Sequence, residues 1–294
     1  MIVITAPTGN IGHQVLNRVL AGDQPVRVIV RDPAKLPTEV RDQVEVIQGS
    51  HGDPQVVTRA FKGADALFWL MPADRRAASP DEAFVGFTRP AAEAIRSQGV
   101  ERVVDISALG RGTAYASRAG YVTASLAMDD LIAGTGAAFR ALVAPSFLDN
   151  MLRHAGAIKE HGLFFGTLSP DLALPAVAAR DIAAVAARLL LDGTWTGQEE
   201  VPLLGPEDLS HNDMAQIMSE VLGKPVRFQQ VPGEAFKATL TGRGMSEAMA
   251  QGMVDMMTAK NEGLDNAEPR TPQSTTPTSF RQWCEEVLKP AVLA

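Results

Sequence analysis

Short runs of apolar, mostly β-branched residues alternate along the first half of the chain with segments whose apolar residues recur every three or four positions. Continuous apolar runs, each followed by a helical period, are typical of parallel strands that helices cover on both faces. The predicted strands are Met1–Ile4, Val26–Val30, Val44–Ile47, Ala66–Leu70, Val100–Ile106 and Phe139–Val143. The pattern predicts an α/β fold of the Rossmann type, a doubly wound parallel sheet that binds ligands beyond the carboxyl ends of its strands.

The alternation changes near residue 146, where a helix over 147–161 and a short strand or turn at 163–166 are expected. An alanine-rich helix at 182–191 and a strand at 201–204 then return to the main sheet. The later part therefore forms a smaller, discontinuous, mostly helical C-terminal substrate lobe. The expected domains are a dinucleotide-binding domain of residues 1–150, joined by 176–206, and a substrate-binding lobe of 151–175 and 207–294.

Two features of the second half bear on the lobe. A polar, proline-containing tract at 262–278 precedes an amphipathic helix at 280–288, which predicts a surface loop or lid. Methionines share one helical face, and either pack in the core or line a pocket for a flat hydrophobic substrate. They are Met245, Met249, Met253, Met256 and Met257.

Composition excludes several classes of protein. With 294 residues, 46% of them apolar, the chain can bury a large core. Its net charge is −7, and its acidic and basic residues are interspersed without basic runs, so neither nucleic acid nor an anionic membrane is an expected partner. No apolar run approaches the ~18 residues that span a bilayer. Cys284 is the single cysteine, and the five histidines lack metal-ligand spacing. We expect a cytoplasmic protein that binds a small molecule and no metal. The sequence allows a homo-oligomer but does not decide the oligomeric state.

The first strand leads into a turn and a helix over Thr5–Gly12, with the sequence Thr-Ala-Pro-Thr-Gly-Asn-Ile-Gly. A turn that opens into a helix directs free backbone N–H groups and the positive end of the helix dipole at one point, where a pyrophosphate can bind. Gly9 lets the backbone approach the phosphates, and Gly12 lets the helix pack closely. The third glycine of a dinucleotide fingerprint is absent, because Ala6 and Pro7 stand there. The predicted cofactor contacts are Thr5, Thr8, Gly9, Asn10, Ile11 and Gly12.

Arg31 ends the second predicted strand, where an acidic residue would bind the ribose of NAD and an arginine the 2′-phosphate of NADP. Its planar guanidinium can bind a phosphate through two hydrogen bonds, and Lys35 adds a second positive charge. Asp32, one residue further on, is the group that would favour NAD. The sequence therefore predicts NADPH as the preferred cofactor, with NADH as the alternative.

The glycine turn and several later motifs resemble the NmrA-like family, atypical members of the short-chain dehydrogenase/reductase superfamily, and follow the family's order along the whole chain. The turn is similar to the family's TGATGxxG opening. The other motifs are Val30–Lys35, Asp65–Leu70, Val103–Ser107, Ser146–Asn150, Ala179–Ala183 and Thr278–Trp283. The resemblance implies that Leu70, Met71 and Pro72 form an apolar wall beside the adenosine. Ser50 stands where relatives often carry an aspartate that reaches the adenine.

The wider superfamily reduces carbonyls with serine, tyrosine and a lysine four residues after the tyrosine, whose ammonium lowers the phenol pKa. Ser107 and Tyr121 are the matching candidates for catalysis, but Ser125 stands at the lysine position. An unaided tyrosine with a pKa near 10 is a poor acid at neutral pH, which disfavours a typical alcohol dehydrogenase. The resemblance implies that quinone and dye reductases of this family also deviate from the triad.

Phe147 and Asn150 lie where the chain leaves the last nucleotide-domain strand, at the expected boundary between cofactor and substrate. Phe147 is predicted to stack on a flat substrate, and Asn150 either bonds to the substrate or fixes the crossover backbone. Asp181 is expected to cap the helix that follows it.

The resemblance implies an NAD(P)H-dependent oxidoreductase that reduces a small aromatic, quinone-like or polyketide-like compound by direct hydride transfer. Two other functions fit the missing lysine. One is a non-catalytic NADP(H)-binding redox sensor or regulator, and the other is a non-redox isomerase or cyclase on the same scaffold.

Overall fold

Seven parallel strands form the central sheet of the computed structural model, which describes residues 1–294. Their order across the sheet is β10-β6-β5-β4-β1-β2-β3. The bounds are β1 (Ile2–Ile4), β2 (Val26–Val30), β3 (Glu45–Gln48), β4 (Ala66–Trp69), β5 (Arg102–Ala108), β6 (Ala138–Ala144) and β10 (Gln198–Pro202). The order reverses between β1 and β4, which places the crevice for ligands beyond the carboxyl ends of these two strands. The predicted Rossmann-type sheet is confirmed, including the late strand that returns to it.

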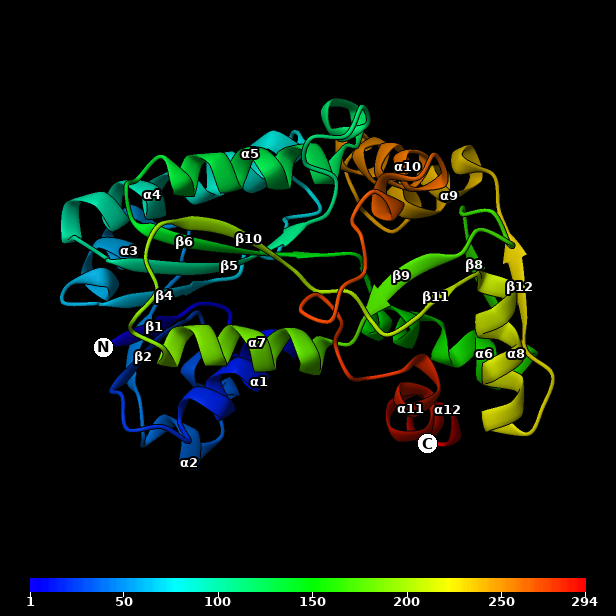
Figure 1. The fold of residues 1–294 in the computed structure, drawn as a ribbon, viewed down its shortest axis with the longest axis horizontal. Helices are drawn as coiled ribbons and strands as arrows, with labels where there is room; N and C mark the ends of the chain where they lie inside the picture. The colour runs from blue at the N-terminus through cyan, green and yellow to red at the C-terminus, as the bar shows by residue number, and fades with distance from the viewer.

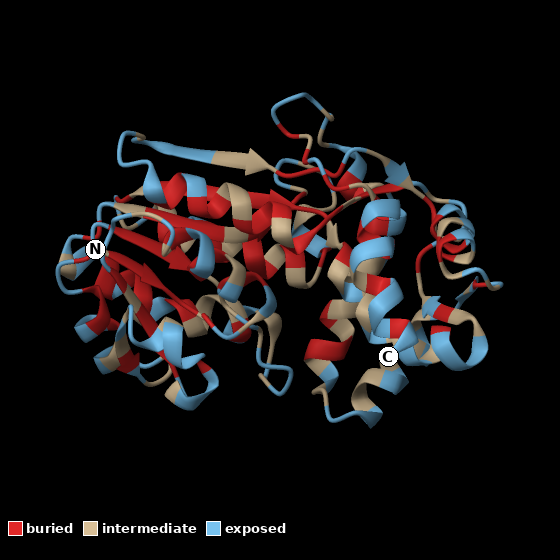
Figure 2. Cartoon of the chain, turned by 90° about the horizontal axis from the view of Figure 1, so that it is seen from below, coloured by how far each residue is buried: buried red, intermediate tan, exposed pale blue.

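Helices cover both faces of the sheet (Figure 1). On one face α1 (Asn10–Val19) packs beside α7 (Ala179–Leu191), and on the other lie α3 (Pro54–Phe61), α4 (Phe87–Gln98) and α5 (Tyr121–Ala133). Successive strand residues point to opposite faces, so Ile2 and Ile4 join one core and Val3 the other. Figure 2 shows the strands buried between the helical layers. Two short segments, α2 (Thr38–Arg41) and the π-helical turn η2 (Glu82–Gly86), complete this half.

The second half adds two small sheets, β11-β9-β7 and β12-β8, and a group of helices. The predicted single helix over 147–161 is wrong at its start, because the chain first pairs with β9 as a strand and then passes through a 3-10 helix. The bounds are β7 (Ser146–Phe147), η4 (Leu148–His154), α6 (Ala155–His161), β8 (Leu163–Gly166), β9 (Leu174–Val177), β11 (Asp208–Leu209), α8 (His211–Leu222), β12 (Arg227–Gln230), α9 (Gly233–Gly242), α10 (Glu247–Asn261), α11 (Phe280–Trp283) and α12 (Lys289–Leu293). No helix is both long and apolar enough to cross a bilayer.

The polar tract before α11 forms a loop that is held against the rest of the protein by hydrogen bonds and an ion pair. The Leu204 N–H donates to the carbonyl of Ser274, and the Thr276 N–H donates to the carbonyl of Leu204, each at 2.7 Å. The Arg270 guanidinium is paired with Asp208. Moving this tract away from the protein would break these hydrogen bonds and leave buried backbone groups without partners.

Asp181 anchors the end of this tract. Its carboxylate accepts hydrogen bonds from the N–H of Thr278 at 3.0 Å and from the Thr278 hydroxyl at 2.8 Å. The predicted capping role of Asp181 is wrong, because α7 begins after Ala178, which makes no side-chain cap. A carboxylate in the first turn of a helix is still well placed for the helix dipole.

Candidate functional site

The glycine turn joins the end of β1 to the start of α1. Ala6 adopts a φ of 48°, a left-handed conformation that favours glycine, which explains why its position in the family motif is a glycine. A Cβ on Gly12 would lie 2.0 Å from the Ala6 carbonyl oxygen, whereas a Cβ on Gly9 would meet that oxygen only at an ordinary 3.4 Å. Gly12 is therefore needed for packing, and Gly9 faces the open side of the turn.

No side chain caps α1, so the first N–H groups of this helix are free to bind an anion. This open helix start fits the pyrophosphate of a dinucleotide. Thr8 and Asn10 are exposed beside it, whereas the Ile11 side chain is buried in the core and offers only its backbone. Asn10 also donates a hydrogen bond from Nδ2 to Oδ1 of Asp149 at 2.9 Å.

Thr5 is fully buried beneath the turn. Its hydroxyl donates to the carbonyl of Phe68 at 3.0 Å, and the Leu70 N–H donates to that hydroxyl oxygen at 2.7 Å. The predicted cofactor contact through this side chain is therefore corrected: Thr5 joins the ends of β1 and β4 and positions the turn. A buried hydroxyl with two such partners has no bond to offer a ligand.

Arg31 and Asp32, the two residues that decide between NADP and NAD in the prediction, are separated by the structure. The Asp32 carboxylate accepts a hydrogen bond from the N–H of Ala34 at 3.1 Å and caps the 3-10 turn Pro33–Lys35. The Arg31 side chain is exposed at the end of β2 and has no ion-pair partner, and neither has Lys35. Both cations are therefore free to bind an anion.

The predicted adenosine wall has a histidine behind it that sequence reasoning missed. Leu70 and Met71 are half-buried, Pro72 is exposed, and the Ser50 hydroxyl accepts a hydrogen bond from the Gly52 N–H at 3.2 Å. His51 meets the rings of Trp69 and Phe87 edge-on, with centroids 5.2 and 5.0 Å away. Burial lowers the pKa of His51 to about 4, so the ring is neutral at physiological pH.

The two predicted catalytic residues have different neighbours. The Tyr121 hydroxyl lies 4.0 Å from the sulfur of Met245, and its ring packs edge-on against Phe84 at 5.8 Å. Burial raises the pKa of Tyr121, as expected without a lysine nearby. Ser107 makes no hydrogen bond to Tyr121 and bonds elsewhere. Met245 precedes α10, where Met249 is buried and the other methionines of the stripe are half-buried.

The partners of Ser107 belong to a buried polar cluster that was not predicted. The Ser107 hydroxyl donates to Oδ2 of Asp129 at 2.5 Å, and its oxygen lies 3.5 Å from the hydroxyl oxygen of Ser125. Asp105, two residues before Ser107, is fully buried, and neither of its carboxyl oxygens has a partner among the neutral and basic groups. Asp105 stands between the apolar Val104 and Ile106 in β5, and Ser125 and Asp129 lie one helical turn apart. These two patterns were the signal in the sequence that could have predicted the cluster.

Phe147 and Asn150 are placed differently from each other. Phe147 lies in β7, half-buried against the core under the sheet, and its stacking on a substrate stays a prediction. The Asn150 side chain is exposed on η4 and makes no hydrogen bond, so it does not fix the crossover, and its contact with a substrate stays a prediction. Asp149 fixes the crossover instead, because its Oδ2 accepts the N–H of Ala179 at 2.9 Å.

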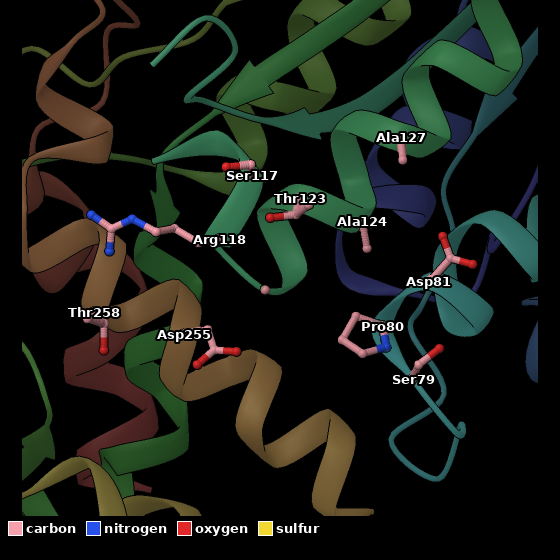
Figure 3. A pocket seen from close by; sticks show the side chains of 11 residues that line it. Ser79, Pro80, Asp81, Ser117, Arg118, Thr123, Ala124, Ala127, Asp255 and Thr258 are labelled. Carbon is pink, nitrogen blue, oxygen red and sulfur yellow. The ribbon is translucent and has the colours of Figure 1, made fainter. Parts of the chain in front are cut away.

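A cleft of about 580 Å³ opens on the outer side of α5, between the segment before η2 and α10 (Figure 3). Its lining is mostly polar: Ser79, Pro80, Asp81, Ser117, Arg118, Gly120, Thr123, Ala124, Ala127, Asp255 and Thr258. None of the predicted cofactor or substrate residues lines it. The open helix start and the free cations lie at the carboxyl ends of the strands, and this cleft is separate from them.

Comparison with known proteins identifies the family of the chain. A family model described as NAD(P)H-binding matches residues 7–193, and the NmrA-like family model matches residues 141–284. A (4-alkanoyl-5-oxo-2,5-dihydrofuran-3-yl)methyl phosphate reductase of Streptomyces griseus is 30% identical over 97% of both chains. An NAD(P)H azoreductase of Xenophilus azovorans is 29% identical over 87% of this chain and 86% of its own.

Among solved structures, an NADPH-dependent quinone oxidoreductase of Escherichia coli in complex with NADPH superposes with a TM-score of 0.77 at 24% identity, covering 96% of this chain and 98% of its own. That likeness extends over the sheet and the later helical part alike, and it shows the fold. From the family models and the near full-length relative, the chain belongs to the NmrA-like group of NAD(P)H-binding proteins.

Proposed function

We propose that the protein is an NADPH-dependent reductase that passes hydride directly to a small aromatic, quinone-like or polyketide-like acceptor. The observation that carries this proposal is the free Arg31 beside an uncapped helix start, in a chain whose relatives are reductases of azo, quinone and dihydrofuran compounds. Azo, quinone and 5-oxo-dihydrofuran groups are conjugated and can chemically take up a hydride, which supports an acceptor of this class.

The chain's own groups fit the cofactor. The N–H groups of Asn10, Ile11 and Gly12, with Gly9 on the open side, would hold the pyrophosphate. Arg31 and Lys35 would bind the 2′-phosphate, and the wall of Leu70–Pro72, with Ser50 at its edge, would lie against the adenosine. When bound, NADPH supplies the hydride; the protein supplies binding, orientation and the exclusion of water.

The substrate side of the proposal uses residues from both halves of the chain. The lobe of residues 151–175 and 207–294 would close the acceptor against the cofactor, with Asn150 and Tyr121 at its edge. Met245 contacts the Tyr121 hydroxyl, which supports a boundary at this place. A thioether next to a half-buried ring suits a flat, polarizable molecule.

The sensor alternative retains one observation in its favour, because Tyr121 and Ser107 are not joined by a hydrogen bond. Stopped-flow oxidation of NADPH with a panel of quinones, azo dyes and aromatic ketones separates the two. The reductase consumes NADPH in proportion to acceptor and yields the two-electron-reduced product. Tight NADPH binding without oxidation by any acceptor would replace the reductase by a sensor or a non-redox enzyme.

A further inference from the structure

The polar cluster under Ser107 joins groups from β5 and α5. Asp105 and Ser107 alternate on β5 and so point to the same face of the sheet, toward α5. Ser125 and Asp129 stand one turn apart on the facing side of that helix. The side chain of Asp129 is 2% exposed, and the residues Asp105 and Ser107 are 0% and 5% exposed. The Ser107 hydroxyl lies at the carboxyl end of β5, and on its other side the cluster meets solvent through the partly exposed Arg111.

The charges around Asp129 come from every element packed against it. Arg111, in the loop after β5, approaches its Oδ2 to 3.5 Å and also pairs with Asp130 at 2.8 Å. Glu200 of β10 pairs with the same guanidinium. Asp105 presents a second carboxyl group, and Ser107 and Ser125 present hydroxyls. One guanidinium thus faces four carboxyl groups, two of them buried.

Two neighbouring buried carboxyl groups cannot both ionise without a large cost. Burial, with the neighbouring Asp129 carboxylate, raises the pKa of Asp105 well above its usual value, so Asp105 keeps its proton. Burial also raises the pKa of Asp129 to about 7, opposed by the hydrogen bond from Ser107, by the neighbouring Asp105 carboxyl group and by the charge of Arg111. The cluster can therefore store a proton and release it under neutral conditions.

We propose that Asp129 supplies, through Ser107, the proton that completes the reduction, in place of the missing tyrosine–lysine pair. This inference rests on the proposed reductase function. With Asp129 protonated, the hydrogen bond between the two side chains reverses: Asp129 donates to the Ser107 oxygen, and the Ser107 hydroxyl hydrogen becomes free to point to the acceptor.

The proton and electrons balance in one concerted step. Hydride transfer brings two electrons and one hydrogen to the acceptor and leaves negative charge on its oxygen or nitrogen. The Ser107 O–H bond breaks and its proton goes to that atom, while the Asp129 carboxyl O–H bond breaks and its proton restores the Ser107 hydroxyl. The Asp129 carboxylate left behind is stabilised by Arg111 and by the Asp105 proton, and it takes up a proton from solvent after the product leaves.

The test compares two acceptors that differ in their need for a proton. A benzoquinone needs a proton after accepting hydride, whereas a cationic triphenylmethane dye becomes neutral on accepting hydride and needs none. Single-turnover rates are measured with both acceptors from pH 5.5 to 8.5. The parent's quinone rate should fall as the pH rises through about 7, because Asp129 then loses the proton it must donate, and its dye rate should show no such fall.

The variants are Asp129→Asn, which keeps the shape and can still accept from Ser107, and Asp130→Asn, the same change one residue along on the solvent side. Asp129→Asn should slow quinone reduction at pH 6 by about ten-fold or more and flatten its pH profile, while dye reduction and NADPH affinity stay unchanged. Ser107→Ala should cause a similar loss, and the double variant should lose little more, because both act in one chain. Asp130→Asn should keep the parent profile.

An Asp129→Asn variant with the parent's rate and profile would overturn the relay, and so would an equal loss with quinone and dye, which indicates a structural role. If the parent oxidises NADPH with neither acceptor, the proposed reductase function fails first and the relay fails with it. These outcomes differ in the parent's own activity, so the two failures are distinguishable.

Discussion

The Asn10 side chain donates a hydrogen bond to the Asp149 carboxylate, 139 residues later in the chain, with Nδ2 2.9 Å from Oδ1. The other carboxylate oxygen accepts the N–H of Ala179 at the start of α7. Asp149 therefore ties the glycine turn to the helix that returns to the sheet, at the point where the chain crosses into the lobe. A change at the cofactor turn is in this way coupled to the position of the lobe.

Removing the Asp149 carboxylate should weaken both the glycine turn and the start of α7. Asp149→Leu leaves the Ala179 N–H and the Asn10 amide without their acceptor, and we expect a loss of about 1–3 kcal/mol in the free energy of unfolding together with weaker NADPH binding. Asp149→Asn is the matched control. Its amide can accept from Ala179 and donate to a flipped Asn10, so chemical denaturation should show a smaller loss; equal losses would contradict the assignment.

Arg31 should set the cofactor preference. Because it has no ion-pair partner and Asp32 is engaged by the Ala34 N–H, Arg31→Ala should weaken NADPH binding by roughly ten- to a hundred-fold and leave NADH binding little changed. Asp32→Asn, which can still accept the capping bond, is the control and should not create an NADH preference. Calorimetric titrations that give equal affinities for NADPH and NADH in the parent would refute this prediction.

Gly9 and Gly12 should respond differently to added side chains. A side chain at Gly9 projects toward the open face, so Gly9→Val should abolish dinucleotide binding while circular dichroism stays native. At Gly12 a Cβ would lie 2.0 Å from the Ala6 carbonyl oxygen, so Gly12→Ala should destabilise the fold itself. Normal binding by a folded Gly9→Val variant would place the nucleotide elsewhere.

The Rossmann-type sheet and most of its helices could be predicted, because buried parallel strands leave continuous apolar runs and the strand–turn–helix of Thr5–Gly12 has local turn chemistry. The start of the lobe could not. Phe147 pairs with β9, a tertiary contact that overrides the helical period of the residues after it. The tract before α11 reads as a loop in sequence, since its anchors Leu204 and Asp181 are distant in the chain.

The site divides in the same way. The turn and Arg31 are local features at strand ends, so the sequence predicts where they lie, and their contacts with the cofactor stay predictions. The sequence around Thr5 does not reveal that its hydroxyl bonds to β4. Asp105 and Asp129 are ordinary acids until β5 and α5 pack together. Their role depends on their burial and on each other's charge, and neither can be predicted from the spacing of these residues in the sequence.

Acid should destabilise the protein through His211, whose ring stacks on Phe228 at 4.2 Å between centroids. Burial lowers the pKa of His211 to about 4. Between about pH 6.5 and pH 4 the unfolded chain therefore binds a proton at His211, whereas the folded protein does not. Stability is therefore lost as the pH falls from 6.5 toward 4. The phenyl ring of His211→Phe cannot bind a proton. When the pH is lowered from 7 to 5, the free energy of unfolding of this variant should therefore rise by about 2 kcal/mol relative to that of the parent. Parallel stability curves for parent and variant in urea would rule this out.

Tyr121 should matter little for the chemical step. It lacks a neighbouring ammonium, burial raises its pKa, and its hydroxyl faces Met245. Tyr121→Phe should reduce single-turnover NADPH oxidation by a quinone less than about ten-fold, below the 10²–10⁴-fold contribution typical of a general acid. A thousand-fold loss in the stopped flow would restore Tyr121 as the catalytic acid.

Direct hydride transfer from NADPH to a flat acceptor is the central claim, and isotope transfer tests it most directly. The protein is incubated with a cationic triphenylmethane dye and NADPH carrying deuterium at both C4 positions, and the colourless product is weighed by mass spectrometry. The account predicts a product one mass unit heavier than that formed with ordinary NADPH, because the new C–H bond of the dye comes from the nicotinamide. A product without deuterium, or no product while NADPH remains bound, would contradict it.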